Sequence, residues 1–143
     1  RDKWSGKLVV KGVLCPDDAI NIKDIGVDAI YVSNHGGRQL NAAPTVIESL
    51  ISIREVVGKN YPLIYDGGIR NGEHVAKAMA SGANFTMLGR SVMYALGAGG
   101  KVGLECVLES IEKECDSSIG LLGCCTPSEV GSHSLAQYFS RKA

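Results

Sequence analysis

Ionisable side chains stand beside glycines at several places in the chain. Residues 33–38 read SNHGGR and place the imidazole of His35 three residues before the guanidinium of Arg38. An imidazole can serve as a general base near neutral pH. A turn needs its glycines for backbone freedom, but it needs neither of these two side chains. The run therefore predicts either solvated loop residues or a catalytic pair.

Three further runs have the same character. They are Lys11 with Gly12, the segment DGGIR at 66–70, and Gly89 with Arg90. Glycines let backbone N–H groups approach an anion, helix N-termini add positive potential, and guanidinium groups can bind phosphate oxygens in pairs. The last two runs together predict a phosphate site.

Each of the four runs follows a short apolar segment. These segments are KLVVKG at 7–12, DAIYVSN at 28–34, YPLIYDGG at 61–68 and NFTMLGR at 84–90. They are rich in β-branched and aromatic residues and too short for helices, so we expect four buried parallel strands. The chemically active residues would then lie at the carboxyl ends of the strands.

Helices are expected between the strands and after them. Their ends are marked by proline, glycine and capping residues: 16–26, 44–58, 71–82, a short helix at 91–96, and a longer one from about Val102 to Glu114 after the break GAGG at 97–100. The motif TPSEV at 126–130 predicts one more helix. This β-α alternation fits an open doubly wound sheet or part of a (β/α)₈ barrel, and the pattern leaves both open.

Composition narrows the function classes. The chain has 143 residues, a formal net charge of zero and 45% hydrophobic residues, which does not favour nucleic-acid binding. No apolar run approaches the length of a membrane span. The five cysteines show no zinc spacing, so we expect reduced thiols and no metal site. The start at Arg1 instead of Met predicts a fragment or a processed chain.

The runs KGV, SNHGGRQL, DGGIRNG and SGANFTMLGR, in this order, resemble the FMN-dependent α-hydroxy-acid dehydrogenase/oxidase family. The likeness extends from about Gly6 to the segment GLLGCCTPSEV and is nearest to the bacterial L-lactate dehydrogenases. It implies an α/β fold in which residues 1–143 form the second half, strands 5–8, of a (β/α)₈ TIM barrel. It also implies that the first half-barrel is missing and that relatives are homo-oligomers.

The resemblance also assigns roles. His35 would be the catalytic base and contact the substrate, and Arg38 would bind the substrate carboxylate. FMN would be held by nine residues: Lys11, Ser33, Asp66, Gly67, Gly68, Ile69, Arg70, Gly89 and Arg90. We expect no catalytic role for Ser91, and structural or exposed positions for His74 and His133.

The expected reaction is FMN-dependent oxidation of a small L-2-hydroxy acid, lactate first and glycolate second, to the 2-oxo acid. A non-catalytic half-barrel that binds flavin or phosphate is the alternative. A third candidate, a related FMN barrel such as an isopentenyl-diphosphate isomerase, would not need the pair His35 and Arg38. The expected location is the cytoplasm, with peripheral attachment to the inner membrane as the alternative.

Overall fold

The computed structural model describes residues 1–135 of the chain. Its strands are Val9–Val13 (β1), Ala29–Val32 (β2), Leu63–Tyr65 (β3) and Phe85–Thr86 (β4). Its helices are Pro16–Asp24 (α1), Val46–Val57 (α2), Gly72–Ala80 (α3) and Arg90–Leu121 (α4). Single 3₁₀ turns occur at His35–Gly37 (η1), Pro127–Glu129 (η2) and Ser132–Ser134 (η3).

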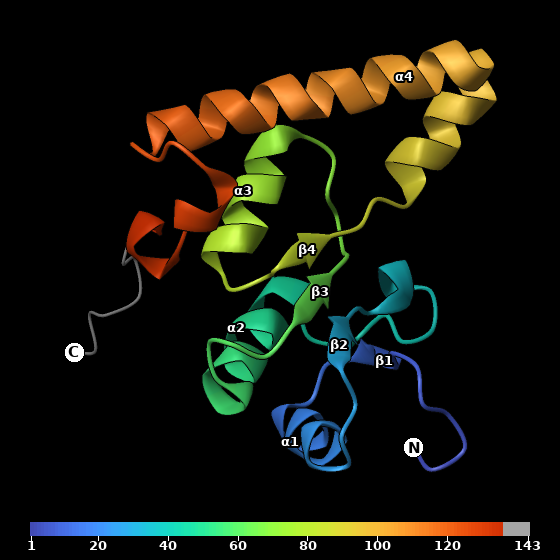
Figure 1. Ribbon diagram of the computed structural model, residues 1–143. Coiled ribbons are helices and arrows are strands. Elements are labelled where there is room, and N and C mark those ends of the chain that lie inside the picture. The colour runs from blue at the N-terminus through green and yellow to red at the C-terminus, as the bar shows by residue number, and fades with distance from the viewer. Residues whose placement is uncertain (136–143) are drawn as a thin grey trace.

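The four strands form one parallel sheet in the order β1-β2-β3-β4. Each strand therefore pairs with its successor in the chain, as the β-α alternation predicts, and β1 and β4 are the two edges (Figure 1). β2, β3 and β4 are shorter than their apolar segments, because the end of each segment leaves the sheet and enters a loop. β1 instead begins two residues later than its segment, keeps Lys11 and Gly12, and continues to Val13.

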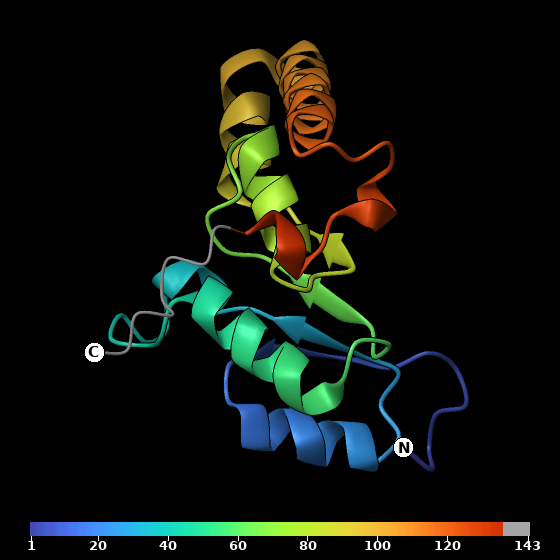
Figure 2. The same cartoon turned by 90° about the vertical axis from the view of Figure 1, so that its left-hand side faces the viewer.

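One face of the sheet is covered by helices. Ile30, Val32 and Leu63 lie on this face and are fully buried. They pack in one core with residues of the helices, among them Leu50 and Ile53 of α2. Figure 2 shows α1 and α2 side by side along the sheet. Burial of this apolar face is the main stabilising contribution to the sheet.

The opposite face is open in the described part of the chain. Lys11, Tyr31, Ile64 and Phe85 form a row across the four strands. None of the four is buried, and Phe85 is 61% exposed. A parallel sheet is normally covered on both faces, so this face is suited to packing against further structure.

Helix α4 has a sharp break inside it. Gly99 and Gly100 have non-helical backbone angles, and Gly100 has φ +56°, so the predicted break at 97–100 is confirmed. Figure 1 shows the short first part turning into the long second part, which crosses α3. The expected end at Glu114 is wrong. Cys115 and Ile119 pack in a second apolar cluster with Ala80 of α3, and this contact carries the helix on to Leu121.

The motif TPSEV does not start a helix in the described residues. It forms only the single turn η2, after which Val130 is extended. The Glu129 carboxylate accepts hydrogen bonds from the Cys125 N–H and the Thr126 hydroxyl, as its capping motif suggests. Val130 is buried in the cluster with Ala80, and this contact takes the chain out of the helical path.

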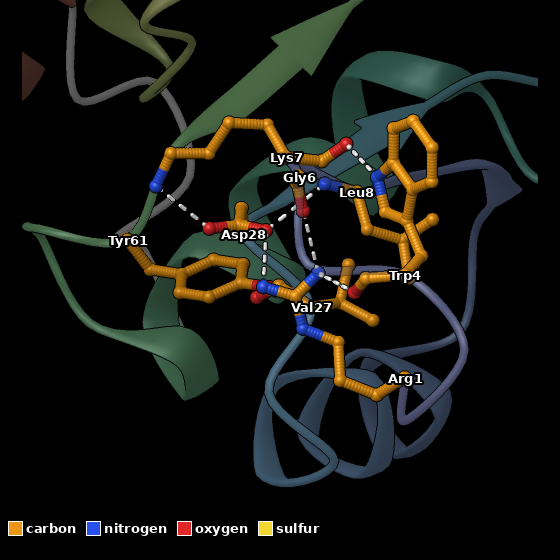
Figure 3. A network of polar contacts seen from close by, with 8 residues as sticks. All are labelled: Arg1, Trp4, Gly6, Lys7, Leu8, Val27, Asp28 and Tyr61. Carbon is orange, nitrogen blue, oxygen red and sulfur yellow. Dashed lines mark hydrogen bonds and ion pairs between the residues drawn. The ribbon is translucent and has the colours of Figure 1, made fainter.

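A polar network fixes the first residues to the start of β2 (Figure 3). The Asp28 carboxylate contacts Lys7 at 2.8 Å and Arg1 at 3.1 Å, and accepts a hydrogen bond from the Leu8 N–H at 2.9 Å. The Lys7 and Leu8 hydrogen bonds hold the pKa of Asp28 below its usual range. This network lies at the amino end of the strands, so it anchors β1 at the end opposite the site.

No helix in residues 1–135 is both long and apolar enough to cross the membrane.

Candidate active site

The loops that follow the four strands meet around one cavity of about 320 Å³. Ten of the eleven residues predicted from the sequence line it: Lys11, His35, Arg38, Asp66, Gly67, Gly68, Ile69, Arg70, Gly89 and Arg90. The exception is Ser33, which is fully buried beneath it. The parallel register explains this convergence, because the carboxyl ends of neighbouring strands lie at one edge of the sheet.

Lys11 joins three strand ends. Its ammonium donates to the Ser33 hydroxyl at 2.9 Å and lies 3.3 Å from the Asp66 carboxylate. It also lies 4.6 Å from the centre of the Tyr31 ring, within the range of a cation–π contact. The cluster therefore fixes one positive charge on the open face of the sheet. Burial and the neighbouring Asp66 carboxylate raise the pKa of Tyr31, so its phenol stays neutral at physiological pH.

His35 projects from the turn η1 directly after β2. Its φ is +55°, a left-handed conformation that is uncommon outside glycine. Its backbone N–H donates to the buried Ser33 hydroxyl at 3.1 Å. Ser33 thus contacts both Lys11 and His35. The imidazole is exposed at the cavity wall and open to a ligand.

Arg38 closes the same turn. Its N–H donates to the His35 carbonyl at 3.4 Å, and its side chain is exposed along the cavity. No hydrogen bond or ion pair of its guanidinium occurs within residues 1–135. A guanidinium in the same cavity as an imidazole is suited to binding a carboxylate.

Two loops form the other end of the cavity. After β3, Gly67 and Gly68 have φ +135° and +79°. Gly67 must lack a side chain, because a Cβ there would lie 2.7 Å from a methyl of Val46. After β4, Gly89 precedes the first turn of α4, whose leading N–H groups have no partner within the helix. Together with the exposed guanidinium groups of Arg70 and Arg90, these N–H groups could bind an anion.

A serine connects the two loops. The Ser91 hydroxyl donates to the Ile69 carbonyl at 3.1 Å, and Ser91 also lines the cavity. The Ile69 side chain is buried in the core, so only its backbone faces a ligand. The Arg90 side chain extends toward the turn η1 after β2. Its Nη2 atom lies 3.8 Å from where a Cβ of Gly36 would lie.

Sequence reasoning missed several residues of the cavity. Met87 and Met93 give it apolar surface, and Ser91, for which we expected no catalytic role, links two of its loops. A polar residue after a strand is a readable signal, but an exposed methionine is not. His74 and His133 are both exposed, as expected. In residues 1–135 no group of histidine, cysteine and acidic side chains could hold a metal ion.

The hydrogen-bond donors that line the cavity fit a ligand with a phosphate at one end and a planar ring at the other. The anion site with Arg70 and Arg90 matches a terminal phosphate. Asp66 can accept hydrogen bonds from hydroxyl groups between the ends. At the far end, the Lys11 ammonium can face the electron-rich edge of a ring. These features agree with the donor set that FMN requires.

The fold and the site define a parallel α/β protein that binds its ligand at the carboxyl ends of the strands. Residues 1–137 match the family described as FMN-dependent dehydrogenase. The chain belongs to this FMN-dependent family, which confirms the resemblance drawn from its motifs and the cofactor expected for it.

Named relatives have similar sequences. The L-lactate dehydrogenase of Caulobacter sp. (strain K31) is 43% identical over 137 residues, which are 96% of this chain and 36% of that protein. The L-lactate dehydrogenase of Actinobacillus pleuropneumoniae serotype 5b (strain L20) is 47% identical over 114 residues, 80% of this chain and 30% of that protein. The chain therefore spans about a third of the length of these relatives.

Solved structures agree with the fold. Mandelate oxidase with benzoyl-formic acid has a TM-score of 0.83 and 43% identity, over 87% of this chain and 37% of that chain. A structure of (S)-mandelate dehydrogenase, described as a monotopic membrane protein, has a TM-score of 0.89 and 36% identity, over 94% of this chain and 36% of that chain.

Proposed function

We propose that the intact protein containing this chain oxidises a small L-2-hydroxy acid to the 2-oxo acid with FMN. The observation that carries the proposal is the single cavity in which His35 and Arg38 face the loops of Arg70 and Arg90. The similar enzymes named above are L-lactate dehydrogenases and mandelate enzymes, whose substrates share a 2-hydroxy-acid core. We take L-lactate as the first candidate substrate and glycolate as the second.

We further propose that residues 1–143 form strands 5–8, the second half, of a (β/α)₈ TIM barrel. The four-stranded sheet with one uncovered face supports this, as does the length of the relatives. The missing half-barrel would pack against the row of Tyr31, Ile64 and Phe85. Homo-oligomer formation, a cytoplasmic location and peripheral membrane attachment stay predictions.

In the proposed reaction, His35 removes the proton from the substrate hydroxyl as the α-hydrogen leaves with its electron pair. FMN, when bound, accepts that hydride equivalent. Arg38 holds the substrate carboxylate in a two-point pair, which fixes the α-carbon relative to the imidazole.

The remaining residues hold the cofactor. Lys11 would place its positive charge near the ring, where negative charge develops on reduction. Ser33 and Asp66 keep Lys11 in position, and Asp66 would also accept from the ribityl chain. The loops at 67–70 and 89–90 would bind the phosphate.

The direct test uses the intact protein. His35→Gln should keep FMN and slow anaerobic flavin reduction by L-lactate by about 10²–10⁴-fold, the usual effect of losing a general base. Arg38→Lys should raise KM as well as lower the rate, because an ammonium cannot form the planar two-point pair. His133→Gln is the matched control, since His133 is exposed in η3 and does not line the cavity. Reduction of the His35 variant at the parental rate contradicts the proposal.

The cofactor has a separate test. Heat should release FMN and not FAD from the purified intact protein, because the anion site offers two arginines to a single terminal phosphate. Chromatography of the released flavin identifies it. FAD, or a folded full-length protein without flavin, contradicts the site assignment.

The second candidate function is a half-barrel that binds flavin or phosphate without catalysis. The open face and the two free strand edges favour it for the isolated chain. For the 143-residue chain alone we expect weak or absent FMN binding and no reduction by L-lactate. Fluorescence titration with FMN, followed by anaerobic addition of L-lactate, decides this. Tight binding with rapid bleaching would mean that half-barrels can assemble the site without the missing half.

A further inference from the structure

A glycine in β1 lies directly against the imidazole of His35. β1 pairs with β2 through Lys11 and Val13, and the register shifts between them, so Gly12 is the extra residue of a β-bulge. Its φ is +93°, where side chains are rarely tolerated. Bulges of this kind often occur next to active sites, where they redirect side chains.

The space above Gly12 is filled by the ring of His35. A Cβ on Gly12 would lie 2.5 Å from Cε1 of the imidazole, 3.3 Å from Nε2 and 3.5 Å from Nδ1. All three atoms belong to the ring, so the imidazole packs on the bare backbone of the bulge. Even one methyl group there requires the ring to move.

Little else holds the ring in place. Neither ring nitrogen of His35 makes a hydrogen bond within residues 1–135, and the side chain is exposed. The backbone of His35 is fixed by its N–H bond to Ser33 and by its unusual φ of +55°. Contact with Gly12 is therefore the feature in this part of the chain that sets how the ring tilts.

We propose that Gly12 is a positioning residue for His35. The backbone of the bulge, bare at Gly12, contacts the imidazole and sets its distance and tilt relative to the substrate hydroxyl. The inference rests on the proposed function, in which His35 is the base. Proton transfer requires hydrogen-bond reach, and a displacement of about 1 Å can cost roughly 10²-fold in rate.

The test is Gly12→Ala in the intact protein. We expect FMN to stay bound and flavin reduction by L-lactate to slow by roughly 10–100-fold. Gly26→Ala is the matched control, because Gly26 has φ +79° with no atom within 4 Å of a new Cβ. It introduces the same kind of backbone strain without touching the ring, so its reduction rate should equal the parental rate.

Two more variants separate positioning from general damage. Gly12→Asn adds the same Cβ but tolerates positive φ better, so it should fold and still reduce slowly. In the double variant Gly12→Ala with His35→Gln, the glycine substitution should slow flavin reduction less than twofold beyond the His35→Gln variant. The effects of two substitutions are not additive when the residues act together.

Each result of these experiments either supports or overturns the role of Gly12. Parental reduction by Gly12→Ala or Gly12→Asn overturns the inference, and so does a full additive loss in the double variant. Loss of folding or FMN in both Gly12 variants but not in Gly26→Ala also overturns it, because Gly12 would then support the fold or Lys11. If His35→Gln alone keeps the parental rate, the proposed function fails instead.

Discussion

The sharpest consequence of the site geometry concerns the buried hydroxyl of Ser33. It accepts hydrogen bonds from the Lys11 ammonium at 2.9 Å and from the His35 N–H at 3.1 Å. Ser33→Ala removes one oxygen that connects the proposed base to the proposed ring-facing cation. We therefore expect a functional loss in the intact protein even though no ligand-facing atom changes.

The size of the loss follows from burial. The Ser33 side chain is fully buried and its hydrogen bond with the His35 N–H is partly buried, so loss of this acceptor costs about 1–2 kcal/mol. Lys11 keeps Asp66 and is 41% exposed, so its lost bond adds only about 0.5 kcal/mol. If His35 and Lys11 shift so that this total of about 2 kcal/mol is lost from the transition state, kcat/KM falls roughly 30-fold.

The assay is anaerobic stopped-flow reduction of bound FMN by L-lactate, with FMN affinity measured in parallel. Ser81→Ala is the control, because Ser81 is a similarly buried serine at the far end of α3. Its rate should stay within twofold of the parent. A Ser33→Ala protein with parental rate and FMN affinity would refute the view that this hydroxyl holds the site together.

Three other predictions concern the same intact protein. Asp28→Asn should lower the urea midpoint at pH 7, and the gap to the parent should shrink as pH falls below the ordinary pKa of an aspartate: the folded pKa of Asp28 is lowered, so its stabilisation is full above that ordinary pKa and is lost as pH falls through the folded pKa. A gap that does not shrink in acid contradicts this. Arg54→Lys should lower unfolding free energy by about 1–3 kcal/mol, measured by urea titration, because the guanidinium makes five hydrogen bonds to carbonyl and amide oxygens that an ammonium cannot reproduce. Ser91→Ala should weaken FMN binding roughly 2–10-fold by freeing the Ile69 carbonyl, while riboflavin, which lacks the phosphate, binds as before; equal losses for both ligands would refute a role at the phosphate loops.

The parallel sheet could be predicted from the sequence because its signals are local. Each strand is a short β-branched run followed by a polar residue or glycine, and each active residue comes directly after it. The convergence of Lys11, His35 and Asp66 then follows from parallel register alone. The strands' exact ends could not be predicted. The side chains of Ser33 and Asp66, after β2 and β3, contact Lys11, whereas Lys11 and Gly12 stay inside β1.

The errors lie where distant contacts decide the local structure. Nothing near Glu114 in the sequence indicates that α4 continues, because the stabilising partner of Ile119 is Ala80 of α3. The same cluster holds Val130 and stops a helix that the local capping pattern favours. The contact between Gly12 and His35 was missed for a similar reason, since it depends on a bulge that shows only in the pairing of β1 with β2.

The order of the strands also bears on how the molecule assembles during synthesis. Because every strand pairs with the next one in the chain, each new β-α unit can dock on the unit made just before it. Such local contacts form quickly, whereas contacts between distant parts of a chain carry a larger loop-closure entropy. The sheet can therefore grow from β1 to β4 as the chain leaves the ribosome. If the other half of a barrel covers the open face, as we propose, that closure joins segments far apart in the chain, and we expect it to be the slowest step of folding.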